Sequence, residues 1–322
     1  MTIAELERAQ ASPAQRSSVF SKILVATDFC EASRRALCDA LALARHEDAR
    51  VYVVHALTPD IQYLSLERPP ELDLARLEAE RQMQGLIGGL DGEHRIESVV
   101  LSRVGPVAGV VAALIRDKEI DLLVIGTRGR GGLRKLALGS VAEELLRVAP
   151  CPVLTIGPRA ELAPLTDTAR FHTILFATDF GKAAAKALPL ALALARAHKA
   201  KLIVVHAMPT MPATAGNLGA FLPPAAVADK FMAWQVSMRT QSLQRLKECL
   251  PAQTGLQQEP EYIVGTDFAP EGILTAAAEH NVDLIVMGAN RVFSARAAAH
   301  LPWVVVHEVV GNAPCPVLTV AG

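Results

Sequence analysis

The sequence is poor in aromatic residues and nearly balanced in charge. Phe, Trp and Tyr make up 4% of the 322 residues, so Ala, Val, Leu and Ile must build the cores, which favours close packing of helices on sheets. The formal net charge of −1 argues against a surface built for nucleic acid or for a membrane. No His or Cys residues stand at metal-ligand spacing with further partners, and no Ser–His–Asp order is readable, so neither a metal motif nor a catalytic triad is predicted.

Disulfide pairing and export signals are also missing. The five cysteines are an odd number without a CxxC pair, which indicates free thiols in a reducing compartment. Residues 1–20 lack the apolar centre of a signal peptide and are expected to form a flexible leader. The longest uncharged stretch, residues 208–228, holds four prolines and two glycines, which predicts a long loop or a lid rather than a membrane helix. These features together predict a cytoplasmic protein.

One stretch of the chain occurs twice. Lys22–Phe29 (KILVATDF) returns as Thr173–Phe180 (TILFATDF), with Asp28 and Asp179 separated by 151 positions, and His55 and His206 are separated by the same 151 positions. A chain of this length is commonly two domains, and the repeat divides it near the middle. The predicted divisions are a leader at 1–20, a first module at 21–157, a linker at 158–170 and a second module at 171–322.

Short apolar runs alternate with longer segments of helical spacing. This alternation predicts an α/β fold of two tandem doubly wound modules, each a five-stranded parallel sheet with helices on both faces. In the first half the expected strands are 23–27, 50–56, 95–103, 121–126 and 152–156, and the expected helices are 31–46, 71–86, 107–118 and 141–148. In the second half the expected strands are 173–178, 201–207, 258–264, 283–288 and 316–320, and the expected helices are 182–198, 229–249 and 270–280.

A glycine-rich loop follows the fourth strand of the first half. It reads Gly126-Thr127-Arg128-Gly129, then nine residues, then Gly139-Ser140. In open α/β sheets, ligands bind at the carboxyl ends of the strands, where glycines permit close approach and a helix N-terminus attracts an anion. Arg128, Arg130, Arg134 and Lys135 add positive charge, so the loop suits a polyphosphate. It is neither a Walker A sequence nor GxGxxG, since Arg134 takes the place of the last glycine.

The pattern Gly-x2-Gly-x9-Gly-Ser after a strand, with Thr27-Asp28-Phe29 ending the first strand, resembles the universal stress protein family. The strand ending Val53-Val54-His55-Ala56 and the closing Pro150–Leu154 fit the same family, and the resemblance covers nearly all of the chain past residue 20. Family members with this glycine pattern bind ATP, and Ala26 stands where they often have Pro. The resemblance implies that these residues contact the nucleotide: Ala26, Thr27 and Asp28 on the adenine and ribose side; Ala56, Ile125 and Gly126 around the base; Gly129, Gly139, Ser140 and Val141 around the phosphates. The positive charge of the loop adds Arg128 and Arg130 to the predicted phosphate contacts.

The second half departs from this pattern. Aligned back from Cys315-Pro316, the positions of Gly139-Ser140 fall at Trp303-Val304, and Arg291 replaces Gly129. Trp303 has the bulk to fill a phosphate cleft, although an ordinary core position is the alternative. Asp179 and Gly288 remain, so the base side is expected to persist. We therefore predict one ATP site per chain.

Some of these residues have simpler explanations. Asp28 is a typical helix-capping residue, and any one of the loop arginines can be a solvated surface residue. His55 and His206 end apolar strands and are expected to be satisfied, buried histidines. Cys151 and Cys315 sit between prolines and are expected to pack in the core.

The resemblance implies a cytoplasmic universal stress protein that binds ATP, alone or with Mg²⁺, and acts in a stress response or in signalling. One alternative is a slow ATPase that uses the loop cations on the γ-phosphate, and another is an interaction scaffold without nucleotide. Family modules pair through their fifth strands, so Pro152–Ile156 and Pro316–Val320 are expected to form an internal pseudo-dimer, with a homodimer as a further option. Nucleic acid and membranes are not expected partners.

Overall fold

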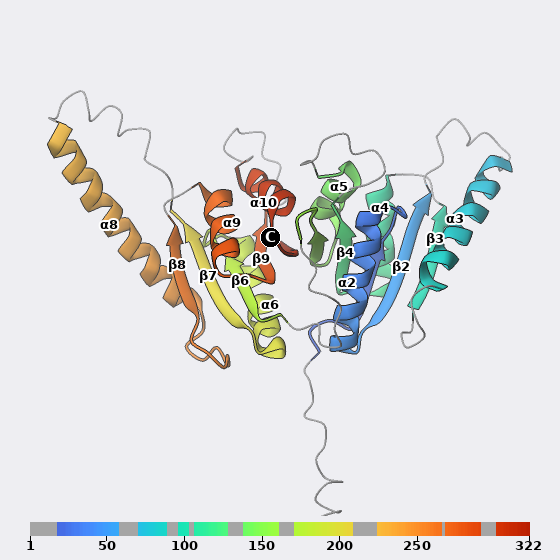
Figure 1. Ribbon diagram of the computed structural model, residues 1–322, viewed down its shortest axis with the longest axis horizontal. Coiled ribbons are helices and arrows are strands. Elements are labelled where there is room, and N and C mark those ends of the chain that lie inside the picture. Colours follow the sequence, from blue (N-terminus) through green and yellow to red (C-terminus); the bar gives the residue numbers. More distant parts are fainter. Residues whose placement is uncertain are drawn as a thin grey trace, which may run out of the picture.

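Strands and helices alternate through both halves of the computed structural model (Figure 1). It describes residues 18–57, 70–88, 96–102, 106–127, 138–160, 171–208, 224–265, 268–290 and 301–322. The first half contains β1 (Lys22–Ala26), α2 (Glu31–Glu47), β2 (Arg50–Leu57), α3 (Pro70–Gly88), β3 (Ile96–Ser102), α4 (Val107–Lys118), β4 (Leu122–Gly126), α5 (Ser140–Val148) and β5 (Val153–Ile156). The second half contains β6 (Thr173–Ala177), α6 (Lys182–His198), β7 (Lys201–Ala207), α8 (Pro224–Cys249), β8 (Glu261–Gly265), α9 (Ala269–Glu279), β9 (Leu284–Ala289), α10 (Leu301–Asn312) and β10 (Val317–Ala321).

The strands of both halves form one ten-stranded sheet, in the order β3-β2-β1-β4-β5-β10-β9-β6-β7-β8. Within each half all five strands are parallel and follow the same doubly wound order, as the sequence predicts. The halves join where β5 and β10 pair antiparallel, and these are the two strands expected to meet. The sheets of the two modules are therefore continuous rather than separate.

The junction between β5 and β10 has near two-fold symmetry. Leu154 pairs with Leu318, and these two residues hold equivalent positions in the two modules. On either side of them, the buried Thr155 hydroxyl donates to the Val317 carbonyl at 3.0 Å, and the buried Thr319 hydroxyl donates to the Val153 carbonyl at 3.3 Å. A pseudo-two-fold axis therefore passes between the two leucines, as in an isologous interface.

Helices cover both faces of this sheet. Along β1, Ile23 and Val25 point into a core shared with α2, α3, α6 and α8, whereas Leu24 points into a core shared with α4, α5, α9 and α10. Each core contains buried residues of both halves, so each continues across the junction. In Figure 1 the two halves lie side by side, with α3 beyond one outer edge and α8 beyond the other.

The sequence analysis named no helix before the last strand, yet α10 is there. Its sequence Trp303–Val310 (WVVVHEVV) is rich in valine, a residue that favours strands by propensity. Val306, Val309 and Val310 are buried at helical spacing, so packing against the sheet overrides that propensity. Helix α8 also begins earlier than predicted, within the stretch 208–228, whose residues 209–223 lie outside the described part of the chain.

Candidate functional site

The residues predicted for the base side come together at the carboxyl edge of the sheet. Strand β1 lies between β2 and β4, so the chain leaves β1 in one direction and later returns on its other side. Such a switch point is where open α/β sheets bind ligands. Ala26 pairs with Ile125 in register, which places the ends of β1 and β4 next to one another. The residues at this edge are Ala26, Thr27, Ala56, Ile125 and Gly126.

Asp28 organises the turn between β1 and α2. Its Oδ1 accepts hydrogen bonds from the Cys30 N–H at 3.1 Å and from the Ser33 hydroxyl at 2.9 Å. The Thr27 hydroxyl accepts a bond from the Phe29 N–H at 3.0 Å, while Phe29 itself has a positive φ of 64°. The carboxylate thus lies at the start of α2, close to the capping role considered above, although the N-cap residue is Cys30.

The same contacts keep Asp28 ionised. Burial raises the pKa of Asp28, but hydrogen bonds from the thiol and N–H of Cys30 and from the Ser33 hydroxyl together lower it, so that the net pKa lies below its ordinary 3.8. This stabilising contribution is present above the unfolded pKa and is lost as pH falls through the lower folded pKa. An anion at neutral pH repels phosphate, so Asp28 suits the nucleoside end of a nucleotide and not its phosphates.

His55 on β2 contacts this turn through a hydrogen bond and through its ring. Its Nδ1 lies 2.7 Å from the Thr27 carbonyl oxygen, so Nδ1 carries the proton and donates it. Its ring lies 4.5 Å from that of Phe29. The second half repeats both contacts. His206 Nδ1 lies 2.8 Å from the Thr178 carbonyl oxygen, and the centres of the His206 and Phe180 rings are 4.4 Å apart. Both histidines are hydrogen-bonded as expected, but they are half-buried rather than buried. Burial lowers the pKa of His206 by more than the bond to Thr178 raises it.

The phosphate side is described only at the two ends of its loop. Arg128, Gly129 and Arg130 lie outside the described residues, so their predicted contacts stay predictions. The Gly139 N–H donates to the Thr127 carbonyl at 2.8 Å, and the Thr127 N–H donates to Ile156 on β5 at 3.2 Å. These bonds hold both ends of the loop against the edge of the sheet, beside the turn that contains Asp28.

Helix α5 begins at the end of this loop with an uncapped N-terminus. Gly139 is its N-cap residue and makes no side-chain capping bond, and Ser140 and Val141 are exposed. The first backbone N–H groups of a helix have no partner within the helix and carry partial positive charge. Together with the Ser140 hydroxyl, they offer donors to an anion at the place where the resemblance puts the phosphates of ATP.

Gly126 has a packing role that the sequence analysis missed. A Cβ at Gly126 would lie 2.7 Å from the backbone carbon of Ala32 in α2, and one at Gly288 would lie 2.3 Å from that of Ala183 in α6. Both glycines therefore let the first helix of a module approach its fourth strand. The retention of Gly288 in the second half is explained by this approach, and a base side in the second module stays a prediction.

We expect Gly126→Ala to destabilise the protein by about 1–3 kcal/mol, because backbone must move to admit the methyl group. Urea unfolding measures this change. The control is Gly109→Ala at an exposed position of helix α4, where a Cβ meets no atom within 4 Å. That change should stabilise by about 0.5–1 kcal/mol through helix propensity. Equal effects of the two substitutions would contradict the packing role of Gly126.

The second half keeps the turn but not the uncapped helix start. The Asp179 Oδ1 accepts the Gly181 N–H at 2.7 Å, but Ala184 stands at the position of Ser33. Helix α10 begins at Leu301, so Trp303 and Val304, the equivalents of Gly139 and Ser140, already lie within a helix. The loop residues 291–300 and the Trp303 side chain lie outside the description, so filling of a cleft by Trp303 stays a prediction.

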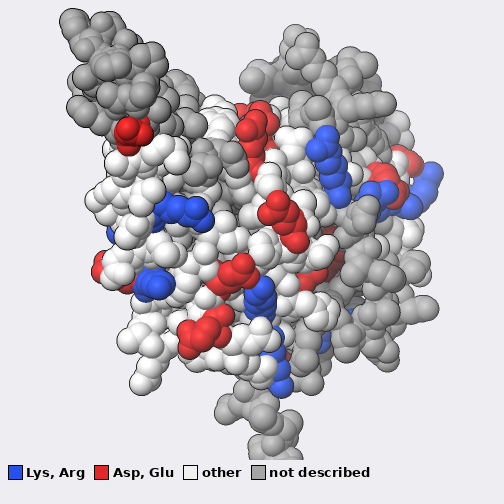
Figure 2. All heavy atoms as spheres, turned by 60° about the vertical axis from the view of Figure 1, so that its left-hand side comes forward, with Lys and Arg blue, Asp and Glu red and all other residues white. Residues whose placement is uncertain are grey.

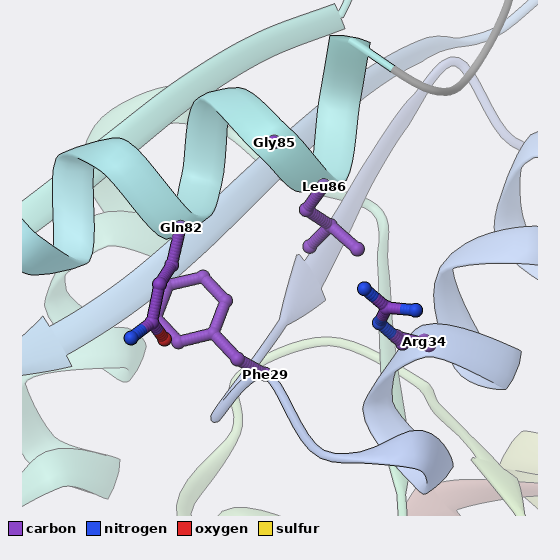
Figure 3. Close-up of a pocket in the computed structure, with 5 residues that line it drawn as sticks. All are labelled: Phe29, Arg34, Gln82, Gly85 and Leu86. Atoms are coloured by element: carbon purple, nitrogen blue, oxygen red, sulfur yellow. The ribbon is translucent and has the colours of Figure 1, made fainter.

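A separate cavity opens between α2 and α3, on the sheet face opposite to α5. It measures about 440 Å³ and is lined by Phe29, Arg34, Gln82, Gly85 and Leu86. Figure 3 shows Gln82 and Leu86 extending from α3, with Phe29 and the Arg34 guanidinium facing them from the β1–α2 turn and from α2. In the second half, the Arg245 guanidinium lies 4.2 Å from the centre of the equivalent Phe180 ring. The sequence analysis missed this cavity, because its lining joins the Phe29 turn and α2 to α3, a helix that carries no motif and lies about 50 residues further along the chain.

Basic and acidic side chains are interspersed on the face drawn in Figure 2, with no large region of one sign among the described residues. This arrangement agrees with the near-neutral net charge. Within the described part of the chain, every helix is too short or too polar to cross a membrane.

Comparison with known proteins gives a consistent result. The model of the universal stress protein family matches residues 20–157 and again residues 170–321. A universal stress protein of Thermus aquaticus is 36% identical over 138 residues, which are 43% of this chain and 99% of that protein. Among solved structures, a universal stress protein from Archaeoglobus fulgidus is similar over 95% of this chain and 99% of its own, with a TM-score of 0.56 and 17% identity. A protein of unknown function from Pseudomonas aeruginosa is similar over 96% and 95%, with a TM-score of 0.57 and 18% identity. The two structures bear on the fold alone.

Proposed function

Because this chain belongs to the universal stress protein family, as two tandem modules, we propose that it binds ATP through its first module in a stress response or in signalling. The start of α5 carries this proposal. Its N–H groups are not capped by Gly139, and the adjoining loop is tied to the sheet edge beside the β1–α2 turn. A polyphosphate meets unpartnered donors there, while its nucleoside extends toward the anionic Asp28.

The second module is proposed to lack an equivalent site. In α10 the positions of the Gly-Ser pair lie inside the first turn of the helix, so no glycine opens the helix start, and its second residue, Pro302, has no N–H to offer. Asp179 also lacks the hydroxyl that Ser33 supplies to Asp28. These two differences support one nucleotide per chain. In this proposal the second module serves as the partner of the first through the β5–β10 pairing.

We propose binding rather than rapid hydrolysis of ATP. Fast phosphoryl transfer needs a metal held by the protein and a group that positions the attacking water. The sequence from Gly126 to Ala142 contains no carboxylate and no Gln. The Oδ1 of Asp28 already accepts the N–H and hydroxyl groups of its own turn, and the resemblance implies that Asp28 meets the nucleoside end, away from the γ-phosphate. The loop cations and N–H donors bind ground state and transition state alike, which does not accelerate the chemical step.

Titration calorimetry with ATP, with and without Mg²⁺, is expected to give one site per chain. At a hundredfold excess over Kd, ATP should raise the free energy of unfolding by about 2.7 kcal/mol. Nucleotide released from gently purified protein should be mainly ATP. Release of ADP alone, with steady phosphate production in the range of about 1–100 s⁻¹, would favour the ATPase alternative. No heat and no thermal shift would favour the scaffold, and two equal sites would contradict the asymmetry.

A further inference from the structure

Three titratable side chains meet where the two modules join. His46 and Glu47 end α2, and His198 ends α6. The Glu47 Oε1 lies 3.5 Å from His46 Nδ1 and 3.4 Å from His198 Nε2. The side chains of Glu47 and His198 are 2% and 0% exposed, and neither of these two facing atoms has a hydrogen-bond partner among the described residues, so the 3.4 Å approach to one another is their closest polar contact. Sequence spacing does not predict this cluster, because His198 lies about 150 residues from His46 and Glu47 in the chain.

Glu47 and His198 occupy equivalent positions in the two modules. They are separated by 151 residues, as Asp28 and Asp179 are, and each is followed by a left-handed residue that ends its helix. Each also accepts a backbone N–H from the segment that leads into its own module. Val19 donates to the Glu47 Oε2, and Phe171 donates to the His198 Nδ1 at 3.2 Å. Near the axis that relates two like modules, this chain therefore places two unlike residues.

The hydrogen bond from Phe171 determines the tautomer of His198. Since Nδ1 accepts an N–H, Nδ1 carries no proton, and the neutral ring must carry its proton on Nε2. Nε2–H then faces the Glu47 Oε1. Burial raises the pKa of Glu47, but the contact with His198 and the hydrogen bond from the Val19 N–H lower it by more, so the carboxylate is ionised. Its Oε2 accepts the Val19 N–H, and its Oε1 lies toward His198.

The same geometry disfavours a metal ion among these three residues. A histidine that binds a metal through Nε2 donates its Nδ1–H to a neighbouring acceptor, whereas Nδ1 of His198 faces a donor. The rings of His46 and His198 are also stacked, 4.1 Å apart and inclined by 14°. Imidazole lone pairs lie in the ring plane, so one ion cannot lie in the planes of both rings without rotating one of them.

We propose that Glu47 and His198 are a recognition pair that makes each module bind the other half of the same chain in preference to a second copy of itself. In the observed pairing, an acceptor of Glu47 faces a donor of His198. Pairing of two first modules would set two carboxylates against one another, and pairing of two second modules would set two N–H donors against one another. Buried groups without complementary partners are costly, which is how polar residues commonly specify a partner. This inference does not depend on nucleotide binding.

The test uses the full chain with a protease site placed in linker 161–170, cleaved after folding. Dissociation of the halves is followed by analytical ultracentrifugation for the wild type, Glu47→His, His198→Glu and the double exchange. Each single variant creates a like pair and should weaken association by about a hundredfold. The double exchange should return the affinity between the two halves to within about tenfold of the wild type. It restores an acceptor facing a donor and still offers acceptors to the N–H groups of Val19 and Phe171.

His46→Ala is the matched control, since Ala197 holds the equivalent position in the second module. It removes the stacked ring and leaves the pair, so association should stay within about tenfold. If a single variant fails to fold, a folded and associated double exchange still supports the recognition pair. A double exchange that dissociates like the single variants, or that fails to fold, overturns it. Association that requires Zn²⁺ and is lost in EDTA would also overturn it, in favour of a metal site.

Discussion

In the Gly139→Trp variant, saturating ATP is expected to leave the unfolding midpoint unchanged. The wild type should gain about 2.7 kcal/mol at a hundredfold excess over Kd, so loss of the whole gain corresponds to affinity at least about a hundredfold weaker. Gly139 is the N-cap of α5 with φ −67° and ψ 146°, a conformation open to any L-residue. The tryptophan side chain therefore need not strain the backbone, while its bulk stands where the phosphates are proposed to meet the first N–H groups of α5.

Circular dichroism and denaturant unfolding without nucleotide should show that the Gly139→Trp variant keeps its fold. The matched control is Trp303→Ala at the equivalent position in the second module. It should leave the ATP-dependent stabilisation of the first module intact. A normal ATP shift in Gly139→Trp would place the nucleotide elsewhere, and the cavity lined by Phe29 and Leu86 would be the next position to test.

Phe176→Ala is expected to destabilise the protein by about 3–5 kcal/mol in denaturant unfolding. Phe176 is 1% exposed near the middle of β6, where its register neighbours are Val204 on β7 and Val286 on β9. Because aromatic residues are only 4% of the sequence, few side chains of this volume fill the core. Its removal leaves a cavity among small aliphatic residues that cannot close without moving the sheet.

The control for Phe176→Ala is Val25→Ala, because Val25 holds the equivalent position in β1 and is fully buried. That change removes two methyl groups and should cost about 2 kcal/mol. ATP binding should survive in Phe176→Ala at temperatures where the chain is folded, since the proposed site lies in the other module. A loss of less than about 1 kcal/mol would mean that the core collapses around the missing ring.

The spacing of apolar residues along the sequence correctly predicted the strands and helices whose formation depends on neighbouring residues. The central strands are apolar runs buried on both faces, and helices 107–118 and 182–198 have the predicted bounds because their apolar spacing matches the helical period. Helix α10 was missed because its valines favour a strand by propensity, while their burial at positions 306, 309 and 310 depends on a sheet that forms from distant segments. The sequence also located the proposed site, because its residues follow the ends of predicted strands, and open doubly wound sheets bind ligands at those ends.

The sequence by itself determined the duplication, the parallel doubly wound character of each module, the Thr-Asp-Phe turn and the loss of the Gly-Ser pair in the second half. Each of these follows from periodicity or from residue types close together in the chain. Only the tertiary structure decided that the two cores continue across the junction, that Gly126 and Gly288 allow the close approach of a helix, and that Glu47 meets His198. These features depend on contacts between segments up to about 150 residues apart, where burial and the direction of single N–H groups decide what each side chain does.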